Sequence, residues 1–294
     1  MSITASSIST LRNRTGAGLL ACKKALEAAQ GNIEEAIIAM RKTGQIQAAK
    51  KADRVTAEGI IKVQVTPDGK HAIILEVNSE TDFVARDQTF QDFTQHLAQV
   101  ALDHQVQDLS QLAQLAFKEG QTVEQIRQEL VSKTGENIQI RRLQFMETTH
   151  QLGHYVHMNR RGCLVELEGG DAELAKAVAV HIVANNPLAL SPQEVPLELV
   201  EKEREVANAQ AQATGKSAEV IEKMVAGRIN KFLNESSLLG QSFIKEPGLT
   251  VAQYLERAQA KLIRFVCFIV GEGIEKKTVD FAQEIKNQLA DSAN

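Results

Sequence analysis

The chain has 294 residues, 43% of them hydrophobic, so it is long enough for two modest domains or for one domain with an insertion. Its three cysteines, Cys22, Cys163 and Cys267, are far apart and form no CxxC pair, which argues against a disulfide framework or a thiolate metal site. It shows no signal-peptide pattern and no uninterrupted apolar run of about 20 residues. We therefore expect a cytoplasmic protein with no membrane partner.

The formal net charge is −4, but residues 1–54 carry nine Lys and Arg against four Asp and Glu, which gives this segment +5 and leaves −9 for the rest. A basic segment of this kind indicates an acidic partner surface. Nucleic acid is one such partner. With no Trp and only two Tyr, however, the chain has little for base stacking, so direct nucleic-acid binding is the less favoured hypothesis.

Residues 1–54 predict three short helices, the first two separated by the glycine-containing stretch TGAG. The third begins at GNIEEAI, where Asn32 is expected to cap the helix and Glu35 to complete a capping box. The run QAAKKADR at 47–54 has no large apolar residue and predicts a linker.

After residue 54 the pattern changes to strands. The β-branched runs GIIKVQV and HAIILEV flank the turn TPDGK and predict a hairpin. A helix is expected from about Asp87, followed by a second helical tract, TVEQIRQELVSKTG, and a third strand, NIQIRRLQFM. The same order recurs further along, with strands GHYVHM and CLVEL, helix LAKAVAVHIVAN and strand LIRFVCFIV. The sequence thus predicts an α+β fold with two related β-β-α-β units, each with a three-stranded antiparallel sheet.

A long insertion at 191–234 separates the helix of the second unit from its last strand. It opens with Ser191 as a cap and Pro192 at the first helical position, and it predicts a helical hairpin whose tip projects into solvent. The TGKS at its centre is not a phosphate-binding loop, because GxxxxGK requires a glycine where Gln210 stands. We interpret it as a hairpin turn, and VGEGIEKK after the last strand likewise as a turn.

Few residues indicate chemistry. His150, His154 and His157 are spaced so that one helix face could hold a metal, but the segment reads more readily as the start of a strand and no carboxylate or thiolate stands nearby. No Ser/His/Asp or Cys/His set stands out, although such sets can be scattered in a sequence. We expect no catalytic residues, no metal and no cofactor, and therefore no enzyme.

The stretch EVNSETDFVARD leaves the place of Phe83 open. A continuous helix would place Phe83 on one face with Phe90 and favour a core position, whereas Asp87 looks like a helix cap that interrupts it. If TDFV is instead a turn, Phe83 lies at its tip beside Asp82, as an exposed contact residue would.

Several motifs, in this order, resemble those of the bacterial translation elongation factor Ts family over essentially the whole chain. They are LRNRTGAGLLACKKAL, GNIEEAI, MRKTG, AAKKADR, EVNSETDFVAR, GENIQIRR, GHYVH, RRGCLVEL and IRFVCFIVGEGIEKK. The resemblance implies a head of the ubiquitin-associated type at 1–54, core units at 55–147 and at 148–190 with 235–270, a coiled-coil hairpin at 191–234, and a C-terminal module with a helix at 271–294.

The same resemblance implies a guanine-nucleotide exchange factor that binds elongation factor Tu in its GDP-bound and nucleotide-free forms. The positions that match the family's contact surface are Arg12, Leu19 and Leu20 in the head, Thr81, Asp82, Phe83 and Val84 in the intruding loop, His157, and the tail around Asp280 and Phe281. The chain departs from the family at Ser9, where Lys is frequent, and at Leu19 and Leu20, where Met is frequent. Two alternatives stay open: an RNA-binding protein that uses the basic head, and a scaffold that self-associates through the hairpin. The complex with Tu is expected as one heterodimer or as a dimer of heterodimers.

Overall fold

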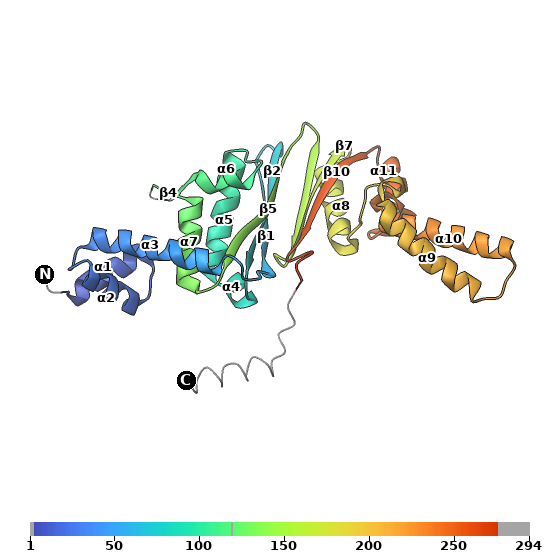
Figure 1. The fold of residues 1–294 in the computed structure, drawn as a ribbon. Coiled ribbons are helices and arrows are strands. Elements are labelled where there is room, and N and C mark those ends of the chain that lie inside the picture. Colours follow the sequence, from blue (N-terminus) through green and yellow to red (C-terminus); the bar gives the residue numbers. More distant parts are fainter. Residues whose placement is uncertain (1–2, 119, 276–294) are drawn as a thin grey trace.

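The computed structural model describes residues 3–118 and 120–275 and combines helices with antiparallel sheets (Figure 1). A helical head lies at one end, two three-stranded sheets lie in the middle, and a helical hairpin extends at the other end. From residue 276 on, the expected C-terminal module, including Asp280 and Phe281, lies outside the described residues. Among the described helices, none is both long and apolar enough to cross a membrane.

The head contains the three predicted helices, α1 (Ala5–Thr15), α2 (Leu19–Ala28) and α3 (Ile33–Lys51). They enclose a small core that includes Leu11, Cys22 and Leu26. Asn32 caps α3 as predicted, but the capping box is not formed: Glu35 accepts a hydrogen bond from the Asn32 side-chain amide, because the Asn32 backbone N–H already donates to Ala29.

The predicted linker at 47–54 is wrong over most of its length, because α3 continues to Lys51. Ala, Gln and Lys all favour helix, and the absence of large apolar residues here reflects close packing rather than a loose chain. Ala48 belongs to the core of the first unit, and the backbone of Gly44 lies against Gln128. The helix thereby joins the head to the first unit.

The first unit is the predicted hairpin, helices and third strand, with sheet order β1-β2-β5. Asp87 caps the main helix as expected, and Phe90, Phe93 and Leu97 on that helix are buried against the sheet. The strands are β1 (Glu58–Val65), β2 (His71–Ser79) and β5 (Ile138–Glu147). The helices are α4 (Asp82–Arg86), α5 (Gln88–Asp103), α6 (Leu109–Gln114) and α7 (Val123–Thr134), with short strands β3 (Ala116–Lys118) and β4 (Gln121–Thr122).

The second unit repeats this strand order as β6-β7-β10. Its strands are β6 (Gln151–His157), β7 (Arg161–Glu168) and β10 (Lys261–Ile269), covered by α8 (Ala172–Asn185). The insertion contains a 3-10 turn at Pro192–Glu194, α9 (Leu197–Gln212) and α10 (Ala218–Ser236), followed by a 3-10 turn at Leu238–Gly240, β8 (Ser242–Phe243), β9 (Glu246–Thr250) and α11 (Val251–Arg257). The TGKS segment is the turn between α9 and α10, as predicted.

The two sheets pack face to face, with helices on their outer faces (Figure 1). Alternate residues of a strand point to opposite faces, so on β2 Ile73 and Leu75 meet the helices of the first unit while Ile74 meets the other sheet. This double burial explains why HAIILEV is a continuous apolar run. Gly162 on β7 allows the close approach, because a Cβ there would lie 2.6 Å from the Ile61 side chain.

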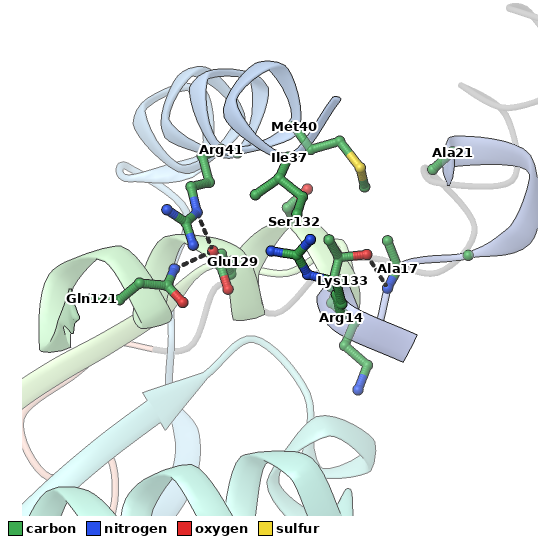
Figure 2. Close-up of a pocket in the computed structure, with 13 residues that line it drawn as sticks. Arg14, Ala17, Ala21, Ile37, Met40, Arg41, Gln121, Glu129, Ser132 and Lys133 are labelled. Atoms are coloured by element: carbon green, nitrogen blue, oxygen red, sulfur yellow. Dashed lines mark hydrogen bonds and ion pairs between the residues drawn. The ribbon is translucent and has the colours of Figure 1, made fainter. Parts of the chain in front are cut away.

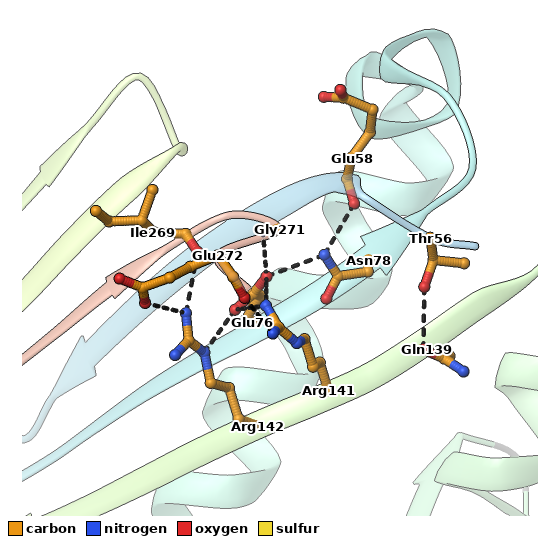
Figure 3. Close-up of polar contacts among 10 residues, drawn as sticks. All are labelled: Thr56, Glu58, Glu76, Asn78, Gln139, Arg141, Arg142, Ile269, Gly271 and Glu272. Carbon is orange, nitrogen blue, oxygen red and sulfur yellow. Dashed lines mark hydrogen bonds and ion pairs between the residues drawn. The ribbon is translucent and has the colours of Figure 1, made fainter. Parts of the chain in front are cut away.

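Buried carboxylates lie between the sheets. Glu76 on β2 is fully buried and accepts hydrogen bonds from Arg141 (3.1 Å), Arg142 (2.6 Å), Asn78 (2.9 Å) and the backbone N–H of Gly271 (2.8 Å), as Figure 3 shows. Burial by itself would raise the pKa of Glu76, but these donors outweigh it and hold the pKa below its ordinary value. The carboxylate therefore stays charged and joins the two units.

The contacts between the units have two-fold equivalents. Arg142 on β5 donates to the carbonyl of Ile269 at the end of β10 (3.0 Å), and Arg264 on β10 donates to the carbonyl of Glu147 at the end of β5 (2.8 Å). Each arginine also binds a buried glutamate, Glu76 in one unit and Glu166 in the other. The two units thus share strand order and the way each meets its neighbour.

Candidate interaction site

The TDFV segment forms a short helix, α4, that places Phe83 outside the protein. Thr81 is the cap residue, and its hydroxyl accepts from the Val84 N–H (3.5 Å). Val84 and Ala85 are buried in the core of the first unit, whereas the Phe83 side chain is 80% exposed. The helix ends at Arg86, and the extended backbone of Asp87 separates it from α5, so the two helices are not continuous and Phe83 is not a core residue.

The base of α4 is braced by the GEN segment after α7. Glu136 accepts from both the backbone N–H (3.0 Å) and the hydroxyl (2.6 Å) of Thr81. The Glu80 carboxylate accepts from the N–H of Asn137 (2.6 Å), and the Asn137 side chain donates to the carbonyls of Ala52 and Arg54 after α3. The exposed aromatic ring therefore stands on a base tied to the head and to the sheet.

Asp82 and Arg86 pair along α4 at 2.9 Å, one turn apart. Both line a cleft of about 460 Å³ whose opposite side is the β6–β7 turn, including Met158 and Arg160. This turn directly follows His157. The structure thus brings Asp82 close to the segment that carries His157, although the two are far apart in sequence.

The predicted head residues Arg12, Leu19 and Leu20 are all exposed, and the leucine side chains are 59% and 65% accessible at the start of α2. A separate cavity of about 160 Å³ lies between the head and α7 (Figure 2). There Arg41 of α3 pairs with Glu129 of α7 at 3.4 Å, and Gln121 donates to the same carboxylate. These polar contacts help to fix the head on the first unit.

His157 is exposed at the end of β6, where its Nδ1 lies 3.1 Å from the hydroxyl of Tyr155. Because the segment is a strand, His154 and His157 point to opposite faces and do not form the helical metal site considered above. Within the described residues there is no group of three or more His, Cys, Asp or Glu that could hold a metal. Cys163 and Cys267 are opposite each other on β7 and β10, and burial raises the pKa of Cys267 to about 11, which makes it a poor nucleophile.

Sequence reasoning missed the bracing residues Glu80, Glu136 and Asn137 and the exposed Met158. The first three lie in the quoted motifs EVNSETDFVAR and GENIQIRR, but nothing in their local spacing indicates that the two motifs meet. For Met158 a signal was present, because a bulky residue at the centre of a tight hairpin turn is unusual.

Comparisons with known proteins point to a single family. The family model "Elongation factor TS" matches residues 80–272. Curated elongation factor Ts proteins are 50% identical to this chain in Legionella pneumophila, over 98% of both chains, and in Thioalkalivibrio sulfidiphilus, over 98% of this chain and 99% of the relative. A third, from Alcanivorax borkumensis, is 50% identical over 95% of this chain and 98% of the relative. The chain therefore belongs to the elongation factor Ts family.

Proposed function

We propose that this protein is the guanine-nucleotide exchange factor of elongation factor Tu in translation elongation. It accelerates GDP release by inserting the TDFV helix near the magnesium and phosphate site of Tu, and it stabilises the nucleotide-free complex. The observation that carries this proposal is the exposed Phe83 on a braced helix: an aromatic ring that adds nothing to its own core is suited to burial in a partner. The reaction needs no covalent step and no cofactor.

The energy that loosens GDP must come from more than one side chain. A thousandfold faster release requires about 4 kcal/mol of barrier lowering. Burying one Phe contributes about 1.5–3 kcal/mol. Phe83 therefore directs the binding energy into the nucleotide site, and a wider surface supplies the rest.

We place that wider surface on Arg12, Leu19 and Leu20 of the head, on His157, and on the C-terminal tail. The exposure of the first four residues supports this assignment. Within TDFV the roles differ: Phe83 and Asp82 face the partner, whereas Thr81 and Val84 hold the helix from below. Asp82 and the displaced Tu backbone then disturb the magnesium and phosphate contacts.

Thermodynamic linkage explains how the exchange factor leaves Tu after GDP has been released. If this protein weakens GDP binding by some factor, nucleotide must weaken the binding of this protein by the same factor. GTP binding to the complex therefore releases the exchange factor. The exchange factor works in the cytoplasm. Its complex with Tu is one heterodimer or a dimer of heterodimers, and sedimentation of the complex distinguishes these two assemblies.

The remaining assignments of the fold are proposals of the same kind. We propose a ubiquitin-associated type of head at 1–54, a coiled-coil hairpin at 191–234, core units at 55–147 and at 148–190 with 235–270, and a C-terminal module from 271. Separate apolar clusters in the head, the two units and the hairpin support these divisions.

Release of a fluorescent GDP analogue from Tu tests the function. We expect catalytic amounts of this protein to accelerate release severalfold or more in the presence of magnesium and excess unlabelled GDP. No acceleration, together with salt-dependent RNA binding, would instead support the RNA-binding alternative. The ion pair of Arg41 with Glu129 outside the head offsets one of the head's five net positive charges, which speaks against that alternative.

A further inference from the structure

The turn between β6 and β7 holds Met158 in an unfavourable backbone conformation. Met158 has φ = 50° and Asn159 has φ = 57°, the left-handed region that Gly, Asn and Asp adopt more readily than other residues. The Met158 side chain is also 80% exposed, so it contributes almost nothing to the core of this chain. A strained backbone combined with an exposed apolar side chain brings the folded protein no compensating gain.

The turn is nevertheless held firmly. The carbonyl of Asn159 accepts from the N–H of Ile61 on β1 (2.7 Å), and Arg160 forms an ion pair with Glu58 (2.5 Å). The carbonyl of Arg160 accepts from the N–H of Val270 after β10 (2.9 Å). Contacts with both sheets therefore fix the backbone of the turn that carries Met158 before any partner arrives, so binding does not have to order this backbone.

Met158 lies across a cleft from α4. The lining of this cleft of about 460 Å³ includes Met158 on one side and Asp82, Ala85 and Arg86 on the other, and Phe83 is the residue next to Asp82. Phe83 and Met158 are the two most exposed large apolar side chains among the described residues. Met158 lines this cleft itself, whereas Phe83 stands on α4, whose Asp82 and Arg86 line the other side. The residues of the Glu58–Arg160 and Asp82–Arg86 ion pairs also line it.

We propose that Met158 is a second apolar contact residue of the interface with elongation factor Tu, seating an apolar ridge of Tu over the cleft beside Phe83. This inference rests on the proposed function. The occupant is the Tu molecule that receives Phe83, because the cleft is continuous with α4 and no other described element covers it. Met158 adds affinity without entering the nucleotide site, so it affects complex formation rather than the release step itself.

Three substitutions at this position separate contact from folding. Met158→Asn suits the left-handed turn but removes the apolar side chain, Met158→Gly relieves the strain altogether, and Met158→Leu retains an apolar side chain. Each variant is titrated against Tu carrying fluorescent GDP, which yields the half-saturating concentration and the maximal release rate. The melting temperature of each free variant is measured alongside.

We expect Met158→Asn and Met158→Gly to raise the half-saturating concentration about tenfold with the maximal rate within twofold of wild type, and Met158→Leu to stay near wild type. The melting temperature of Met158→Gly should equal or exceed that of wild type. If Met158→Asn leaves the half-saturating concentration unchanged, the inference is overturned. The proposed function still stands in that case, provided that the wild-type protein accelerates GDP release from Tu. A lower melting temperature of Met158→Gly would also overturn the inference, since the side chain would then serve the fold of the free protein.

Discussion

Replacing Glu76 by Gln tests the junction between the two core units. The substitution retains the shape of the side chain but removes its charge and one of its two acceptor oxygens. Glu76 is fully buried, and its carboxylate accepts hydrogen bonds from the side chains of Arg141, Arg142 and Asn78 and from the backbone N–H of Gly271. A neutral amide leaves the two arginines without their buried counter-charge.

The size of the effect follows from the exposure of the partners. Removing one partner of a buried ion pair costs about 3–5 kcal/mol. The side chains of Arg141 and Arg142 are 24% and 29% exposed, so they regain some water when the carboxylate is lost. We therefore expect the free energy of unfolding to fall by about 3 kcal/mol, the lower end of this range, which corresponds to a decrease of about 1 M in the urea midpoint.

Urea unfolding followed by circular dichroism, at a series of pH values, measures this loss. The pKa of Glu76 is held below its ordinary value of 4.5, so the charged form stabilises the folded state. That stabilisation is complete above about pH 4.5 and is lost as the pH falls through the lowered pKa. The difference in free energy of unfolding between wild type and Glu76→Gln should be constant from pH 8 to 6 and should become smaller below pH 4.5.

Glu201→Gln, on the exposed surface of α9, is the matched control and should match wild type throughout. A Glu76→Gln variant as stable as wild type at pH 7 would show that the buried charge does not stabilise the junction. So would a difference that persists unchanged at acidic pH, since the loss would then not depend on the charge of Glu76.

Two further predictions concern the base of α4 and the packing of β6. Glu136→Gln removes one of the two acceptors for Thr81, so amide hydrogen exchange in α4 should accelerate about tenfold by mass spectrometry; unchanged exchange would argue against the bracing role. Gly153→Ala places a Cβ 2.3 Å from the backbone of Ala175 and should lower the free energy of unfolding by about 1–3 kcal/mol. Gly227→Ala, in open space on α10, should instead raise it by about 0.5–1 kcal/mol. Equal effects of the two substitutions in urea unfolding would count against the close packing of β6 on α8.

The secondary structure could largely be predicted from local patterns. Asp87 precedes an amphipathic run and does cap α5, and the Pro/Asp/Gly turn does join β1 to β2. The prediction was wrong where packing overrides residue size: the Ala- and Lys-rich segment after Gln47 forms helix because Ala48 fits against the first unit. The separate short helix α4 was not predicted either: TDFV was expected as a turn or as part of one helix with α5, since five residues are too few to show a period.

The site was harder to predict because its contacts join distant residues. Glu136 binds Thr81 across 55 positions in the chain, and no local pattern encodes that distance. The register of β7 against β10 likewise sets Cys163 opposite Cys267, though the two are far apart in sequence. Spacing alone left open whether Phe83 lies in the core or on the surface. In the structure its neighbour Val84 is buried in the core, and this turns Phe83 outward.

The effect of Phe83→Ala on GDP release from Tu shows whether the exposed ring drives nucleotide release. Phe83 is 80% exposed, so the variant should melt like wild type; Leu197→Ala, with a side chain 77% exposed on the distant hairpin, is the matched control. Losing the burial of one Phe, about 1.5–3 kcal/mol, corresponds to about a tenfold to hundredfold slower maximal release at saturating exchange factor. We expect that loss of maximal release rate for Phe83→Ala, with a much smaller change in complex formation, and no loss for Leu197→Ala. A maximal release rate equal to wild type in Phe83→Ala would show that the ring does not act on the nucleotide site.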